Sequence, residues 1–314
     1  MSNNAVPFVV LENTDQAADI NASKGPNDIF QQCYRVKQYV KDDEMKLGRH
    51  PNDLEFNQPY QVARDTTTLD WNQCNRTFLA QMAGCNIRCP YCFTGEQSET
   101  KMITPAEYVQ AYREYNNTHP EKRAGVLRVS GGEPLMINQT QDWVSTLIYE
   151  EIDQHEFAWI DTNLTRFPNQ NLQHVLENLK YDQSQNIGFC GCFKPGVDGV
   201  NIYLQLEVAH AFAEITEIFF YWPSWGSNNV EFIDFLHALE KAIPFAPLRL
   251  TVIHIKYHYA AITQDKQTTR QEGETSDNNF HNMRLIWKQF CKDTYPPELL
   301  WLPSHQVKIG QKSC

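Results

Sequence analysis

The stretch AGCNIRCPYCFTG, residues 83–95, places Cys85, Cys89 and Cys92 within eight residues of the chain. Nine cysteines in 314 residues are too few, and odd in number, for a disulfide scaffold. A structural zinc site usually closes at four ligands in two closely spaced pairs, and no further Cys or His at a recognisable spacing completes this triplet. The short spacing also argues against three unrelated buried cysteines. A 4Fe–4S cluster is normally held by four thiolates, so three thiolates would leave one iron open for a substrate or cofactor.

Composition and charge narrow the class of protein. The hydrophobic share of 41% and the charged share of 21% are typical of a globular protein. The formal charge of −11 comes without a basic stripe, which argues against nucleic-acid binding. No apolar run approaches the roughly 18 residues of a membrane span, and the start MSNNAVPFVV does not resemble a signal peptide. We therefore expect a cytoplasmic protein that binds neither nucleic acid nor membrane.

Hydrophobic patterning predicts a parallel α/β sheet or an incomplete barrel. Helix-like stretches at 104–115, 140–152 and 230–242 alternate with short apolar runs of β-rich composition. In such folds the chemistry lies at the carboxyl ends of the strands, and the three cysteines follow the first of them. We also expect a helical stretch near 28–46, a polar linker at 263–279 and a helix at 280–291. The predicted strands are residues 76–83, 125–130, 157–162, 187–193, 216–222 and 248–255.

A second motif follows the next predicted strand. RVSGGEPLM, residues 128–136, contains Gly131 and Gly132, which allow close backbone approach, and Glu133, whose carboxylate can pair with an ammonium group. The cysteine motif has the form C-x3-C-x-aromatic-C, with Tyr91 as the aromatic residue. Together the two motifs resemble those of the radical S-adenosyl-L-methionine (radical SAM) enzymes.

This resemblance implies a fold, two cofactors and a reaction. The cluster would be held by Cys85, Cys89 and Cys92, and its open iron would bind the amino and carboxylate groups of SAM. Reductive cleavage of SAM would then give a 5′-deoxyadenosyl radical that abstracts hydrogen from the substrate, with a flavodoxin or ferredoxin as electron donor. The implied core is a partial (β/α)6 barrel over 71–260, with an N-terminal extension, 1–70, and a C-terminal extension, 261–314. The SAM contacts implied by the motifs are Tyr91, Ser130, Gly131, Gly132 and Glu133.

Finer matches resemble the activating enzyme of pyruvate formate-lyase. They are Asp161 in DTN, Lys194 in CFK and His258 in VIHIKYH, and by resemblance each would contact SAM. The chain departs from those activating enzymes at Leu164. By resemblance, the activating enzymes carry a Gly after Asp-Thr-Asn, where this chain has Leu164. We also note Cys190 and Cys192, which a strand would place on the same side.

Three functions remain open at this stage. The first is a radical SAM enzyme acting on a small molecule or a peptide, in which the residue that meets the substrate is unknown. The second is an activating enzyme that installs a glycyl radical on a partner protein. The third is a non-catalytic iron–sulfur or zinc protein, which would have no use for the Gly-Gly-Glu motif. We expect both extensions to pack on the core and at least one to narrow the barrel opening, which favours a small substrate.

Overall fold

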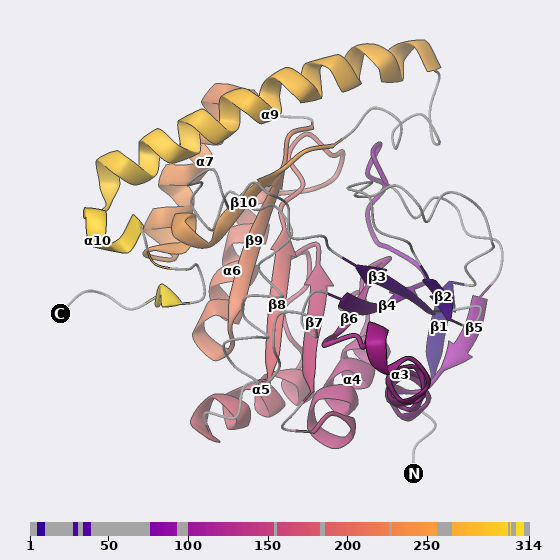
Figure 1. Ribbon diagram of the computed structural model, residues 1–314. Coiled ribbons are helices and arrows are strands. Elements are labelled where there is room, and N and C mark those ends of the chain that lie inside the picture. Colours follow the sequence, from indigo (N-terminus) through magenta and orange to yellow (C-terminus); the bar gives the residue numbers. More distant parts are fainter. Residues whose placement is uncertain are drawn as a thin grey trace.

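The computed structural model is a mixed α/β structure built on one large sheet (Figure 1). None of the described helices has the length and the apolar run needed to cross a bilayer. The structure describes residues 5–9, 28–30, 34–38, 76–92, 100–153, 156–182, 186–225, 228–255, 266–300, 302 and 306–310.

Within these residues, six parallel strands form the main part of the sheet in the order in which the chain visits them. All six lie within two residues of their predicted positions, so the α/β fold with an incomplete six-stranded barrel is confirmed. The strands are β4 (Arg76–Met82), β6 (Val126–Gly131), β7 (Phe157–Thr162), β8 (Ile187–Cys192), β9 (Ile218–Pro223) and β10 (Leu250–Ile253).

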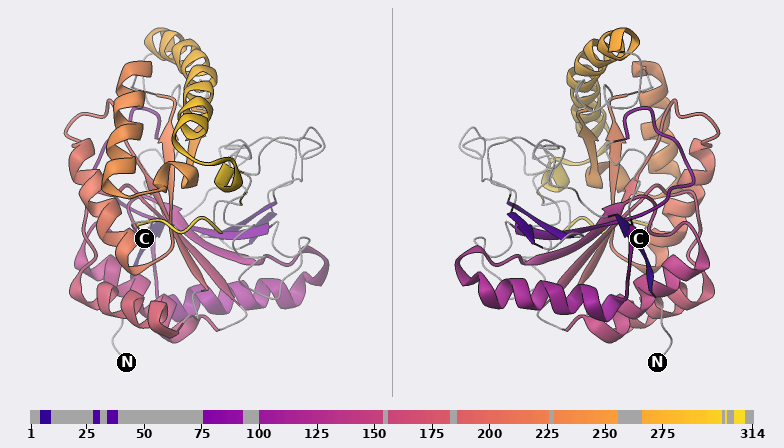
Figure 2. Two further views of the ribbon diagram at one scale, coloured as in Figure 1. Left: turned by 90° about the vertical axis from the view of Figure 1, so that its left-hand side faces the viewer. Right: turned by 90° about the vertical axis from the view of Figure 1, so that its right-hand side faces the viewer.

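Helices follow the strands and cover the outer face of the sheet (Figure 2). Thr104 caps the first of them with its side chain, and Glu107 completes the capping box. The predicted helix at 140–152 is an α-helix that continues into one π-helical turn, η5 (Leu147–Glu151). The α-helices are α3 (Pro105–Thr118), α4 (Asn138–Thr146), α5 (Gln170–Asp182), α6 (Ile202–Ile215) and α7 (Asn229–Ala242).

Alternate residues of each parallel strand face two different cores. Phe78, Leu127 and Ile160 belong to the main core between the sheet and the helices. The inner face carries a second apolar cluster that fills the floor of the partial barrel. Its members are Val126, Phe157, Trp159, Cys190, Phe219 and Tyr221.

The N-terminal part of the chain adds antiparallel strands to the same sheet. Both β1 (Val6–Val9) and β3 (Tyr34–Gln38) pair with β4, while β2 (Asp28–Phe30) pairs with β3. A further strand, β5 (Thr100–Ile103), pairs with β1. The predicted helix near 28–46 is therefore wrong over β2 and β3. The free edge of β4 offers a ladder of hydrogen-bond partners, and such tertiary pairing overrides local helix propensity.

The C-terminal part packs on the same body. Helix α9 (Lys266–Thr294) contacts α7 and β10, and the short helix α10 (Pro297–Leu300) follows it (Figure 1). The predicted helix at 280–291 is confirmed, but the predicted linker at 263–279 is wrong from residue 266 onward. Its Lys, Gln, Arg and Glu residues are good helix formers, so a polar composition was mistaken for a loop.

Buried polar contacts fasten this C-terminal part. Arg249, in the 3-10 turn η6 (Ala246–Arg249), is buried and donates two hydrogen bonds to the carbonyl oxygen of Val307, 2.8 and 2.6 Å long. The indole Nε1 of Trp287 on α9 donates to the carbonyl oxygen of Pro247 over 2.7 Å. The described parts of both predicted extensions thus pack on the core, whereas the domain boundaries at 70 and 260 stay a prediction.

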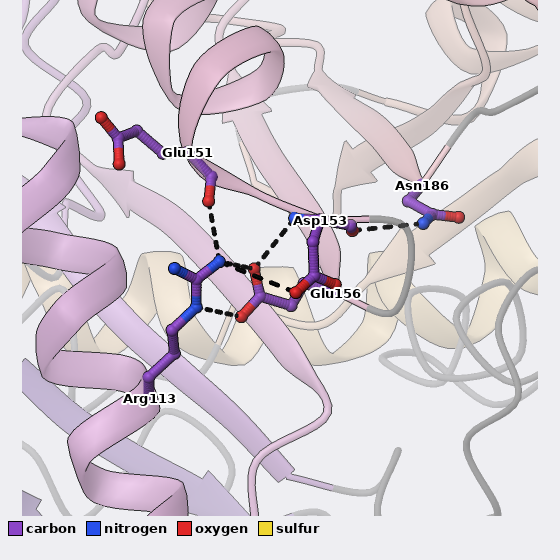
Figure 3. A network of polar contacts seen from close by, with 5 residues as sticks. All are labelled: Arg113, Glu151, Asp153, Glu156 and Asn186. Atoms are coloured by element: carbon purple, nitrogen blue, oxygen red, sulfur yellow. Dashed lines mark hydrogen bonds and ion pairs between the residues drawn. The ribbon is translucent and has the colours of Figure 1, made fainter.

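An ion-pair network joins α3 to the lower end of the barrel (Figure 3). The guanidinium of Arg113 donates to both carboxylate oxygens of Glu156, over 2.8 and 2.7 Å, and to the carbonyl oxygen of Glu151 over 2.9 Å. Glu156 also accepts from the backbone N–H of Asp153. Because Glu156 directly precedes β7, this network sets where that strand begins.

We predict that Arg113→Ala lowers the free energy of unfolding by about 1–2 kcal/mol, because Glu156 is left nearly buried without its main partner. Glu114→Ala is the matched control, since its side chain is exposed on the same helix and should change stability by less than about 0.5 kcal/mol. Urea unfolding of both variants measures the difference. Equal stabilities would show that the network contributes nothing.

Candidate functional site

A cavity of about 200 Å³ lies at the carboxyl ends of the parallel strands. It reaches from the loops that follow the strands down to the inner apolar cluster, which supplies Cys190 and Tyr221 to its wall. Of the site residues expected from the sequence, all but His258 line this cavity, and His258 lies outside the described residues. Those that line it are Cys85, Cys89, Tyr91, Cys92, Ser130, Gly131, Gly132, Glu133, Asp161 and Lys194.

The cysteine loop follows β4 directly. Cys85 is exposed and Cys89 and Cys92 are half-buried, and a turn closes the loop through a 3.0 Å hydrogen bond from the Cys92 N–H to the Cys89 carbonyl oxygen. Although Cys85 is exposed as a residue, desolvation of its sulfur raises the pKa of its thiol, and burial raises the pKa of Cys89 to about 11. Without a bound cation Cys85 and Cys89 therefore resist ionisation, and metal binding is what would stabilise their thiolates.

The three thiols can serve as ligands of an iron–sulfur cluster. Among the described residues, no three Cys, His, Asp or Glu side chains converge closely enough to hold one metal ion. Each thiolate of a 4Fe–4S cluster binds a different iron, so a cluster does not require such convergence. The donor set, three thiols from one loop open to one cavity, therefore fits the cluster.

The Gly-Gly-Glu turn packs against the cysteine loop with its backbone. The N–H of Gly132 donates to the carbonyl oxygen of Met82, and the N–H of Glu133 donates to that of Gly84, each over 2.8 Å. Gly131 has φ +97°, and a Cβ at Gly132 would lie 1.8 Å from the Gly84 carbonyl oxygen. Both positions thus require glycine, because the two loops touch through their main chains.

Glu133 is only 2% exposed, and its carboxylate joins its own loop to the end of β7 and the loop that follows it. One oxygen accepts from the Thr162 hydroxyl over 2.7 Å and from the Leu135 N–H over 3.0 Å. The other accepts from the Asn163 N–H over 2.6 Å. Burial raises the pKa of Glu133 to about 7 despite these donors. From the sequence, the Glu133 carboxylate was expected to pair with an ammonium group. In the structure this carboxylate already binds the end of β7 and the loop after it. The role of Glu133 toward SAM stays a prediction.

Asp161 also has partners within the protein. Arg128, on the inner face of β6, donates to both of its carboxylate oxygens over 2.9 and 3.1 Å, and the Trp159 indole donates over 3.1 Å. Arg128 lines the cavity, so one positive and one negative group stand together just above the apolar floor. Arg128 was not among the site residues predicted from the sequence. Its position two residues before Ser130, on the same face of a predicted strand, was the available signal.

Lys194, which follows β8, lies close to a thiol. Its Nζ is 3.2 Å from the sulfur of Cys192 and 5.7 Å from the centre of the Tyr91 ring. That ring also packs on Trp225, with ring centres 5.9 Å apart. Cys190, the neighbour of Cys192 on this face, is fully buried in the floor, and burial raises its pKa.

A histidine from β10's end reaches the cavity, but it is not the predicted one. His254 lines the cavity and stacks on Phe280 of α9, with ring centres 4.8 Å apart. Helix α9 therefore contacts the cavity wall. His254 was visible in the quoted motif VIHIKYH, but nothing in the sequence alone shows where β10 ends.

The loop after β7 keeps an unusual backbone at Leu164. This buried leucine has φ +57°, in the left-handed region that favours glycine. Its side chain lies over Gly191 on β8, where a Cβ would come within 2.6 Å of it. The sequence departs from the activating enzymes at this position in residue type, but the left-handed backbone that a glycine would favour is present.

Comparison with known protein families gives one match. Residues 75–182, from the start of β4 to the end of α5, match the family model described as a 4Fe-4S single cluster domain. This range includes the three cysteines, the Gly-Gly-Glu turn and Asp161. The comparison with curated protein sequences found no match.

Among solved structures, three similar chains are SuiB from Streptococcus suis. SuiB bound to precursor peptide SuiA has 14% sequence identity and a TM-score of 0.45, over 67% of this chain and 44% of SuiB. SuiB bound to S-adenosylmethionine has 15% identity and a TM-score of 0.38, over 50% of this chain and 36% of SuiB. SuiB alone has 14% identity and a TM-score of 0.37, over 51% and 36%. The chain thus spans less than half of SuiB's length, and scores below 0.5 do not establish a shared fold. The family match, by contrast, covers the part of the chain that carries the three cysteines, and the family that it describes is a 4Fe-4S single cluster domain.

Proposed function

We propose that this chain is a radical SAM enzyme acting on a small molecule or a peptide. The observation that carries the proposal is the main-chain contact between two loops, in which Gly132 lies against Gly84 and brings the Gly-Gly-Glu turn beside the cysteine loop. An electron carrier needs the cysteines but has no use for that turn. The family match to a 4Fe-4S single cluster domain over 75–182 supports the cluster.

In this proposal Cys85, Cys89 and Cys92 hold the cluster, and the Gly-Gly-Glu turn binds the methionine part of SAM through its main chain and the charge of Glu133. When both cofactors are bound, they supply a 5′-deoxyadenosyl radical that removes hydrogen from the substrate. The electron would come from a flavodoxin or ferredoxin.

The protein's own part is to bind, orient and exclude water. The lining of the cavity also includes the Arg128–Asp161 pair and two residues of the apolar floor, Cys190 and Tyr221. The pair would orient a polar group of the reacting molecule, because one side is a donor and the other an acceptor. The floor closes the lower end of the barrel to water, which protects a radical reaction from side reactions.

The first prediction concerns the cluster. Purified without oxygen, the protein should hold about four irons, and Cys85→Ala, Cys89→Ala or Cys92→Ala should each lose most of them. Cys291→Ala is the control, because Cys291 is buried on α9 and does not line the cavity. Iron analysis and electron paramagnetic resonance (EPR) of the reduced protein measure the cluster. A colourless parent protein with one bound zinc would overturn the proposed function.

The second prediction concerns the contact between the loops. Gly132→Ala should lose most of its iron although all three cysteines remain. The new Cβ would lie 1.8 Å from the Gly84 carbonyl oxygen, so it must push the cysteine loop away. Gly199→Ala is the control for a strained backbone, since Gly199 has φ +76° but its Cβ would meet no atom within 4 Å. Full iron in Gly132→Ala would show that the contact is not needed.

The third prediction concerns SAM. Glu133→Gln keeps the size and one acceptor of the side chain but removes its charge, so iron should stay while SAM binding weakens by about ten- to a hundredfold. Because the pKa of Glu133 is raised to about 7, SAM affinity of the parent should rise from pH 6 to pH 8 as the carboxylate forms. That rise should be absent in Glu133→Gln. Anaerobic equilibrium dialysis measures both effects, and unchanged binding by the variant would exclude an ionic role for Glu133.

A further inference from the structure

Asn163 contacts two other loops of the site and helix α6. It follows β7 and is 5% exposed. Its backbone N–H donates to Glu133, from the loop after β6, and its carbonyl oxygen accepts from the Gln205 side chain on α6. Its side chain reaches the cysteine loop, where Nδ2 lies 2.9 Å from the Asn86 Oδ1 and 3.7 Å from the sulfur of Cys85.

The orientation of this amide follows from its partners. Its Oδ1 lies 3.1 Å from the backbone nitrogen of Thr165, which can only donate, so the oxygen must face Thr165 and the NH₂ group must face the cysteine loop. The Thr165 hydroxyl donates to the same oxygen and accepts from the Asn86 side chain over 2.7 Å. Three side chains thus form a closed ring, and the second N–H of Asn163 is left for the Cys85 sulfur.

A hydrogen bond to a cluster sulfur affects the reduction potential of the cluster. Reduction adds one negative charge, part of which resides on the cysteine sulfurs, and a donor directed at such a sulfur stabilises the reduced state. Asn163 carries no charge of its own, so it stabilises that state without forming an ion pair in the cavity.

We propose that Asn163 is a positioning residue: its amide N–H holds the Cys85 sulfur and raises the reduction potential of the 4Fe–4S cluster. This inference rests on the proposed function, because it requires a cluster on Cys85. Asn163, in the loop after β7, would thus influence how readily the cluster accepts an electron. That electron comes from an external one-electron donor.

The test is a redox titration of the cluster-loaded protein followed by EPR. At the midpoint potential of the parent, Asn163→Ala should show a reduced-to-oxidised ratio about tenfold lower, which for one electron is a shift of about 59 mV to more negative potential. Asn163→Asp keeps the acceptor for Thr165 but replaces the donor by an anionic oxygen, so its shift should have the same sign and be at least as large.

Thr165→Val is the matched control. It removes the hydroxyl from the ring but keeps the backbone N–H that orients Asn163, and it leaves the contact with Cys85 in place. Its midpoint should equal that of the parent. An unshifted Asn163→Ala, or an equal shift in Thr165→Val, would overturn the inference.

Cluster loading separates the remaining outcomes. Loss of iron in both Asn163 variants, with full iron in Thr165→Val and unchanged circular dichroism, would support the positioning of Cys85 by Asn163. Loss of iron in all three variants would overturn it, because the ring rather than the sulfur contact would then hold the loop. A parent protein without a cluster would instead refute the proposed function itself.

Discussion

Two backbone hydrogen bonds, from Gly132 to Met82 and from Glu133 to Gly84, hold the loop after β6 against the loop after β4. A parallel sheet brings the carboxyl ends of its strands to one edge, but it does not by itself bring two particular loops into main-chain contact. That contact exists because residue 132 has no side chain. Everything that makes the cavity a candidate site for two cofactors depends on it, since the cysteines come from one loop and the Gly-Gly-Glu turn from the other.

The contact is reinforced by a buried carboxylate. Removing Glu133 from water disfavours its charged form, as its raised pKa shows, and donors from Thr162, Leu135 and Asn163 offset part of that cost. These contacts link the three loops. The Glu133 carboxylate binds the backbone N–H of Asn163, and the Asn163 side chain binds the cysteine loop. Three successive loops are therefore coupled by polar contacts above an apolar floor. A change that removes the Asn163 side-chain contact should therefore be felt at Cys85.

Much of this fold was predictable from the sequence, because short apolar runs of β-rich composition mark the six parallel strands and Thr104 marks the start of α3. The two errors have different causes. The strands at 28–30 and 34–38 exist through pairing with β4, and local composition does not contain that information. The polar half of α9 continues a helix whose packed half lies further along the chain. The motifs placed ten predicted residues around one cavity. They did not reveal that Glu133 and Asp161 already have protein partners, because a spacing does not indicate where a side chain points.

Leu164 adopts a left-handed backbone that normally favours glycine, with φ +57°. Such a backbone at a non-glycine residue costs about 1–2 kcal/mol. Fully burying a leucine side chain contributes about 1.5–3 kcal/mol, and Leu164 is fully buried, so burial offsets the cost of the backbone. The side chain fits because residue 191 on the neighbouring strand is glycine, where a Cβ would lie 2.6 Å from it. A glycine on β8 thus makes room for the leucine, and the loop that carries Asn163 holds its turn without a glycine of its own.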